Sequence, residues 1–112
     1  MKQPQLGEAP AEKAGPIKIE IMNGPEDGRV VVCDILPISI GRADESSVSL
    51  LYDHLISRRH ALVTRSGDDI FLKDLNSRNG TFVGKERVRE STPIEPDELF
   101  RVGATLLRVR PR

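Results

Sequence analysis

The segment RHALVTRSGDDIFLKDL, residues 59–75, consists of two runs rich in Val, Leu and Ile around a short polar stretch. The polar stretch, Ser66-Gly67-Asp68-Asp69, is composed of residues that favour turns. The segment therefore predicts an antiparallel hairpin in which strands over residues 59–65 and 70–75 are joined by a four-residue connection. We expect these two strands to be central in the fold.

Short strands are predicted on both sides of this hairpin. Residues 17–22 alternate isoleucine with Lys, Glu and Met, which is the period-two pattern of a strand with one buried face. A second hairpin is expected where Gly84 stands at the position that a type II′ turn requires. The strands expected besides the central pair cover residues 17–22, 30–35, 38–40, 48–51, 81–83, 86–88, 92–94, 98–102 and 105–109.

These short strands, separated by Gly, Pro and Asp, predict an all-β sandwich. No helical periodicity of ten or more residues occurs anywhere in the chain. Aromatic residues make up only 4% of the sequence and Trp is absent, so the core must come from Ile, Leu and Val, which favour strands.

The length of 112 residues suits one domain. Residues 1–16 hold three prolines and no β-branched residue, which predicts a flexible N-terminal tail before a domain over residues 17–112. Residues 1–16 contain neither an apolar signal core nor a membrane-length run. We therefore expect a soluble, cytoplasmic protein that does not contact membranes.

Charge and cysteine content narrow the classes of partner and cofactor. The chain has 17 basic and 17 acidic side chains, so no overall field draws it to nucleic acid or anionic lipid. Cys33 is the only cysteine, which excludes an internal disulfide and a thiolate zinc site, and we expect it to lie in the core. No metal or other cofactor is expected.

Three polar segments fall at predicted strand ends: Gly41-Arg42, Ser57-Arg58-Arg59-His60, and residues 76–81, NSRNGT. In a sandwich, functional groups usually lie on loops at one end, because the strands are occupied with packing. Arginine forks, short hydroxyl donors and backbone N–H groups in turns are what a phosphate dianion requires. The three segments together therefore predict a site for a phosphate group.

The same residues do not predict catalysis. Ser57 and His60 are three residues apart, and on an extended or turning segment this spacing does not place the imidazole against the hydroxyl. The sequence shows no metal cluster, no glycine-rich nucleotide loop and no paired acid and base. We expect a binding module and not an enzyme.

In order and approximate spacing, Gly41-Arg42, Ser57-x-x-His60 and Asn79-Gly80-Thr81 resemble the motifs of the forkhead-associated (FHA) domain family. The strand pattern extends the resemblance over residues 17–109. It implies a sandwich of about eleven mostly antiparallel strands in two twisted sheets. It also implies that loops at the end opposite the termini bind phosphothreonine peptides.

The resemblance assigns roles to individual residues. Phosphate binding is implied for Arg42, Ser57 and Arg58. Peptide binding is implied for Asn79, with Leu55, Arg59, Ser77 and Arg78 as further candidates. Structural roles are implied for Gly41, His60, Gly80 and Thr81.

Simpler roles remain open for the main candidates. Arg42 can instead pair with Asp44 or Glu45 at the surface, and Ser57 can cap a turn. Asn79 can adopt the left-handed conformation before Gly80 as well as bind peptide. Leu55 stands where some family members have a basic residue that reads an acidic group three residues after the phosphothreonine. An apolar residue is therefore expected at that position of the partner.

The function expected is that of a monomeric signalling adaptor that binds phosphothreonine in a partner protein, such as a Ser/Thr kinase or its substrate. The alternative is an FHA fold used for phosphate-independent association or self-assembly, because a fold alone does not determine function. A third possibility is nucleic-acid binding through the arginines Arg58, Arg59, Arg108, Arg110 and Arg112. It is disfavoured by the zero net charge and by the lack of aromatic residues among these arginines for base stacking.

Overall fold

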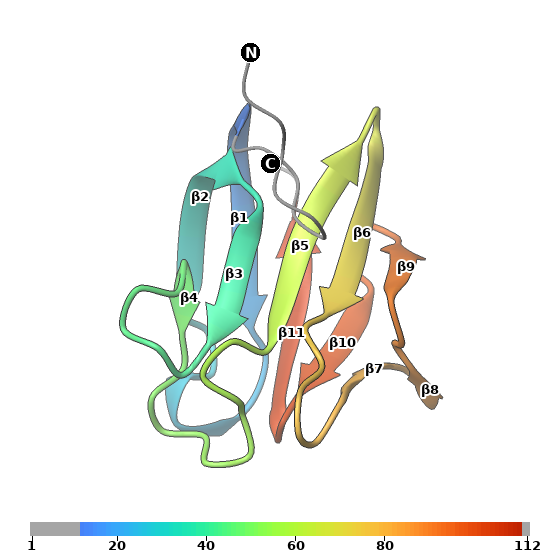
Figure 1. Ribbon diagram of the computed structural model, residues 1–112. Coiled ribbons are helices and arrows are strands. Elements are labelled where there is room, and N and C mark those ends of the chain that lie inside the picture. The colour runs from blue at the N-terminus through green and yellow to red at the C-terminus, as the bar shows by residue number, and fades with distance from the viewer. Residues whose placement is uncertain (1–11, 111–112) are drawn as a thin grey trace.

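The computed structural model describes residues 12–110 and consists of eleven strands and one short 3₁₀ turn (Figure 1). The 3₁₀ turn, η1, covers Gly24–Glu26. The strands are β1 (Glu12–Ile21), β2 (Val30–Leu36), β3 (Ile38–Gly41), β4 (Val48–Ser49), β5 (Ala61–Ser66), β6 (Asp69–Asp74), β7 (Thr81–Val83), β8 (Glu86–Arg87), β9 (Ser91–Ile94), β10 (Leu99–Val102) and β11 (Thr105–Arg110).

The strands form two sheets. One has six strands in the order β2-β1-β11-β10-β7-β8, and the other has five in the order β4-β3-β5-β6-β9. All strand pairs are antiparallel except the short parallel pair β3–β4. The hairpin β5–β6 lies inside the five-stranded sheet, with β3 on one side and β9 on the other, so the expected central position of these strands is confirmed.

The core lies between the two sheets and is built almost entirely from aliphatic side chains. Ile19 of β1 and Leu107 of β11 pack from the six-stranded sheet, and Ile40 and Leu72 pack from the five-stranded sheet, all with 0% exposure. Cys33 belongs to the same cluster, and burial raises the pKa of its thiol above the ordinary value. The aliphatic core predicted from composition is thus confirmed.

Most expected strand boundaries lie within two residues of the observed ones, and the largest difference is at the start of the first strand. The first strand begins at Glu12, five residues before the predicted start, because the backbone of Glu12 and Lys13 pairs with Leu36 and Ile35 of β2 before a register shift. The remainder of the predicted tail, residues 1–11, lies outside the described residues.

The connection in the first hairpin is also shorter than predicted. Ser66 and Asp69 pair with each other, so the turn contains only Gly67 and Asp68, and Gly67 takes a positive φ of 61°. The second hairpin is as expected, since Gly84 has a φ of 59° in the two-residue turn between β7 and β8.

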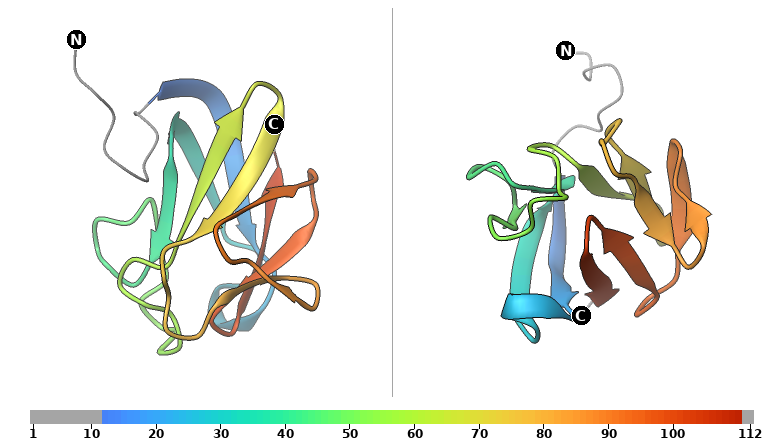
Figure 2. Two further views of the ribbon diagram at one scale, coloured as in Figure 1. Left: turned by 45° about the vertical axis from the view of Figure 1, so that its right-hand side comes forward. Right: turned by 90° about the horizontal axis from the view of Figure 1, so that it is seen from below.

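The loops that carry the polar motifs gather at one end of the sandwich. In Figure 1 the β3–β4, β4–β5 and β6–β7 loops all lie at the lower end, and the turned view of Figure 2 shows them there together. The opposite end holds the β5–β6 turn and the pairing of Lys18 with Arg110 near the end of β11. Within residues 12–110, no helix is long and apolar enough to span a membrane.

Candidate functional site

Backbone hydrogen bonds join the loop after β3 to the loop before β5. The N–H groups of Arg42 and Ala43 donate to the carbonyls of Ser57 and Arg58, each at 3.1 Å. The Nε of Arg42 also donates to the carbonyl of Ile56 at 2.7 Å. Arg42 is thereby held against the segment that carries the candidate phosphate-binding residues Ser57 and Arg58.

Gly41 makes this approach of the two loops possible. A Cβ at this position would lie 2.1 Å from the carbonyl oxygen of Arg58 and 2.9 Å from its carbonyl carbon, both backbone atoms. Glycine is used where two backbones must approach closely. Gly41 is required because a side chain would not fit. Its backbone conformation does not require glycine, since its φ is not positive.

The loop between β6 and β7 is joined to the same segment by two further hydrogen bonds. The N–H of Arg78 donates to Oγ of Ser57 at 3.1 Å, and Nδ2 of Asn79 donates to the carbonyl of Leu55 at 2.8 Å. Ser57 thus accepts a bond from another loop, and the turn cap considered from sequence does not describe it. Its hydroxyl hydrogen is left to donate elsewhere.

His60 lies at the centre of these loops and is fully buried. Its Nδ1 accepts from the N–H of Ser57 at 3.0 Å, which makes Nε2 the protonated nitrogen that donates to the carbonyl of Gly80 at 2.9 Å. The imidazole therefore links two loops through their backbones. Neither of these bonds involves the Ser57 hydroxyl, which accepts from the N–H of Arg78.

Stability is expected to fall as the pH decreases from 7 to 5, because of His60. Burial is the main cause that lowers the pKa of His60 below its ordinary 6.5, so the unfolded chain takes up a proton in this range before the folded one does. The free energy of unfolding, measured by urea denaturation at several pH values, should decline with acid. In His60→Gln, where residue 60 does not titrate, it should stay flat between pH 7 and 5. A decline of equal size in both proteins would show that His60 is not the group responsible for the pH dependence of stability.

Asp74, at the end of β6, organises the β6–β7 loop, a role that the sequence reasoning missed. Its carboxylate accepts from the N–H of Ser77 at 3.0 Å, from Oγ of Ser77 at 2.5 Å and from Oγ1 of Thr81 at 2.7 Å. Burial opposes ionisation of Asp74, but the bonds from Ser77 and Thr81 outweigh it and lower its pKa. The Asp-x-x-Ser spacing is a local signal from which the hydrogen bonds between Asp74 and Ser77 could have been predicted.

Asp53 is a second missed carboxylate and anchors the β4–β5 loop. Its side chain is buried and accepts from the N–H of Leu55 at 2.9 Å, from the N–H of Ala104 at 2.8 Å and from Oγ1 of Thr105 at 2.7 Å. These bonds tie the loop to the β10–β11 turn. Because Thr105 is 52 residues away in sequence, no local pattern predicts this contact.

The remaining candidates also lie at this end, in different settings. Arg58 and Arg78 are exposed, whereas Ser77 and Thr81 are buried and support the loop. Gly80 has a φ of 89° and its N–H donates to Oγ of Ser77 at 3.0 Å. An open cavity of about 300 Å³ adjoins Arg59; its lining is Ser39, Ile40, Ala43, Glu45, Ser46, Arg59 and Leu75.

The simpler roles considered for Arg42 and Asn79 do not match the geometry. Arg42 forms no ion pair with Asp44 or Glu45 within residues 12–110, and its Nε is bound to a carbonyl instead. Asn79 does not take the left-handed conformation, which is found at Asn76 with a φ of 59° and at Gly80.

Together, the three loops present donors that suit an anion. The available donors are the terminal nitrogens of Arg42, the hydroxyl of Ser57 and the exposed guanidinium groups of Arg58 and Arg78. Across the described part of the chain, no three His, Cys, Asp or Glu side chains are grouped so as to hold a metal ion. The arrangement suits a small dianion with a peptide attached.

Comparisons with known proteins agree with this architecture. A profile of the FHA domain matches residues 38–103, more than half of the chain. The FHA domain-containing protein FhaB of Mycolicibacterium smegmatis is 30% identical over 94 residues, which cover 84% of this chain and 60% of that protein. The chain therefore spans less than two thirds of the length of this relative.

Two solved structures share the fold, and this chain covers nearly the whole length of each. One comes from a structural and functional analysis of phosphothreonine-dependent FHA domain interactions, with a TM-score of 0.73, 28% identity, and coverage of 85% of this chain and 95% of that chain. The other is the FhaA FHA domain complexed with the intracellular domain of Rv3910, with a TM-score of 0.68, 29% identity, and coverage of 84% and 99%.

Proposed function

This chain belongs to the FHA domain family, and we propose that it is a binding module for phosphothreonine segments of partner proteins. The observation that carries the proposal is the joining of three loops by hydrogen bonds, which brings Arg42, Ser57 and Asn79 to one end of the sandwich. The similar domain from work on phosphothreonine-dependent interactions supports the same ligand class.

In the proposed complex, Arg42 and Ser57 donate to phosphate oxygens and Arg58 adds a further donor. A phosphothreonine carries a charge of about −1.5 to −2 at pH 7, so each of these bonds is charge-assisted. Such bonds contribute roughly 1.5 to 3 kcal/mol each, and two or three of them with peptide contacts give affinity in the micromolar range. Asn79 is proposed to bond the peptide backbone beside the phosphate.

The supporting groups have a separate task in this proposal. His60, Asp74 and Asp53 hold the loops in place through buried or half-buried hydrogen bonds. Because the donors are already in position, little conformational entropy is lost when the ligand binds. The protein is proposed to act by binding alone, as a monomer, with a phosphoprotein such as a Ser/Thr kinase or its substrate as partner.

The direct test is calorimetric titration of the protein with a matched pair of peptides that differ only in phosphorylation of one threonine. We expect binding of the phosphorylated peptide and none detectable for the other. If partners captured from cells bind equally before and after phosphatase treatment, the phosphate-independent alternative is the better account.

Leu55→Lys is expected to change which residue is preferred three positions after the phosphothreonine. Leu55 is 50% exposed, and its carbonyl is bound to Asn79, so its side chain stands beside the proposed peptide path. The wild type should prefer an apolar residue there, and the variant should prefer Asp or Glu by about fivefold, the upper range for an exposed ion pair. A peptide array scanned at that position measures both preferences.

Leu51→Lys is the matched control for this change. Leu51 is 61% exposed and lies four residues earlier in the same β4–β5 loop, so the variant adds the same charge at another exposed leucine. It should leave the preference at that position unaltered. An equal shift in both variants would mean that general charge, and not a contact of residue 55, sets the preference.

A further inference from the structure

A row of three side chains crosses the outer face of the six-stranded sheet. Phe82 of β7 pairs with Arg87 of β8 on one side and with Arg101 of β10 on the other. Cross-strand partners point to the same face of a sheet. Both arginines are exposed and Phe82 is half-buried. The residue before Phe82, Thr81, instead points inward, with 0% exposure. The Arg87–Phe82–Arg101 row therefore faces solvent.

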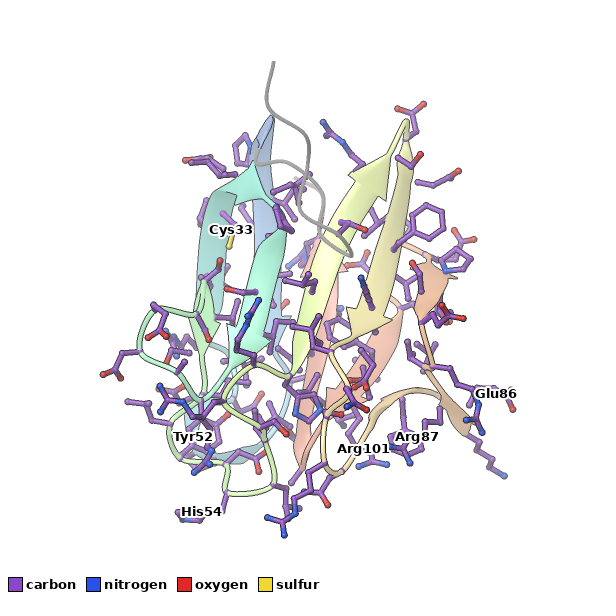
Figure 3. All side chains as sticks on the ribbon, viewed as in Figure 1. Cys33, Tyr52, His54, Glu86, Arg87 and Arg101 are labelled. Carbon is purple, nitrogen blue, oxygen red and sulfur yellow. The ribbon has the colours of Figure 1, made fainter. Side chains whose placement is uncertain are left out.

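The row begins at the loop that carries Asn79. A Cβ added to Gly80 would lie 2.9 Å from Cε1 of Phe82 and 3.0 Å from Nε of Arg87, so both side chains pack against the residue next to Asn79. The Cζ of Arg101 lies 4.4 Å from the Phe82 ring centroid, and its Nη1 donates to the Gly103 carbonyl at 2.7 Å. Figure 3 shows Arg87 and Arg101 close together at the end of the molecule that holds the loops.

The charge of this row is not neutralised by the described part of the protein. Neither Arg87 nor Arg101 has a carboxylate partner within residues 16–110, whose side chains the structure describes. On the same sheet, by contrast, Arg108 and Arg110 pair with Glu20 at 2.8 and 3.5 Å. Two unpaired guanidinium groups on either side of one ring attract an anion, and the planar fork of arginine fits carboxylate or phosphate oxygens.

We propose that the Arg87–Phe82–Arg101 row is a second anion-binding subsite for the partner segment whose phosphothreonine occupies the loops. A peptide that passes Asn79 and Gly80 reaches the row, where a carboxylate or a second phosphate binds Arg87 and Arg101 and the adjoining aliphatic atoms contact Phe82. The inference rests on the proposed function and deepens it. It makes the protein selective for phosphothreonine segments that carry a further acidic or phosphorylated residue.

The test compares phosphothreonine peptides with uncharged flanks against series in which Glu or phosphoserine is placed at successive positions away from the phosphothreonine. Affinities are measured by fluorescence anisotropy at low salt, where exposed charges are least screened. We expect at least one position at which the anion strengthens binding to the wild type by about fivefold. The Glu and phosphoserine series distinguish a carboxylate from a phosphate as the group bound.

The double variant Arg87→Gln/Arg101→Gln should lose this gain and keep its affinity for the uncharged peptide, which also shows that it is folded. If that variant does not fold, Arg87→Gln alone, at an exposed side chain, should lose about half of the gain on a logarithmic scale. Arg110→Gln is the charge-matched control on the same sheet and should keep the gain.

Three results would overturn the inference while leaving the proposed function intact: no anion position improves binding, the variants keep the improvement, or Arg110→Gln loses as much. Failure of the wild type to bind even the uncharged-flank phosphopeptide would instead refute the proposed function, and the inference with it.

Discussion

Arg42→Ala is expected to weaken binding of a phosphothreonine peptide about 100-fold. The reason is that Arg42 offers two terminal nitrogens to the phosphate, and a charge-assisted hydrogen bond contributes roughly 1.5 to 3 kcal/mol. Its Nε bond to Ile56 and its backbone bond to Ser57 hold the guanidinium in place before the ligand arrives. Isothermal titration calorimetry with wild type and variant measures the loss. The unphosphorylated peptide should show no detectable binding to either protein.

Two further variants show whether this effect belongs to Arg42 in particular. Arg42→Lys keeps the charge and loses the planar fork, so an intermediate affinity is expected. Arg29→Ala removes the same charge from an exposed arginine that pairs with Glu26 at 2.7 Å, and it should change affinity less than about twofold. Equal affinities of Arg42→Ala and wild type for the phosphopeptide would refute the proposed role of Arg42.

Gly41→Ala is expected to lower the free energy of unfolding by about 3 kcal/mol and to impair phosphopeptide binding as well. The added Cβ would meet the backbone of Arg58 at 2.1 Å, and backbone atoms cannot rotate away as a flexible side chain does. The two loops must separate, which breaks the bonds from Arg42 and Ala43 to Ser57 and Arg58. Urea denaturation and peptide titration measure the two effects.

Gly67→Ala is the matched control for the steric argument. Nothing lies within 4 Å of a Cβ at Gly67, but its φ of 61° is unfavourable for alanine, which costs about 1 to 2 kcal/mol. This turn lies at the end opposite the loops, so the variant should be destabilised and should bind phosphopeptide normally once folded. A Gly41→Ala protein as stable as the wild type would show that the loops tolerate separation.

Most of the strands could be predicted from sequence, since they depend on local pattern. The alternation over residues 17–22 correctly identifies Ile17, Ile19 and Ile21 as buried, each with no more than 3% exposure. Gly84 marks its hairpin because a positive φ is needed there, and glycine adopts one at little cost. By contrast, Glu12 and Lys13 join β1 through backbone pairing with β2, for which their side chains give no signal.

The candidate site was predictable only in part. The motifs singled out Arg42, Ser57 and Asn79 as candidates, and backbone and side-chain hydrogen bonds join their loops. The motifs alone did not reveal Asp53, because its partners Ala104 and Thr105 are more than fifty residues away. The same holds for the row beside Gly80, whose members come from three strands.

By itself, therefore, the sequence determined the class of fold, the order of its strands and the types of donor available to a ligand. Those properties depend on residue type and on spacing within one strand or turn. Only the tertiary structure decided which loops are joined, which carboxylates support them, and which of the arginines remain without a carboxylate partner within residues 16–110. The reason is physical: these relations are contacts between strands and loops far apart in the chain, and they exist only once the two sheets have packed around their core.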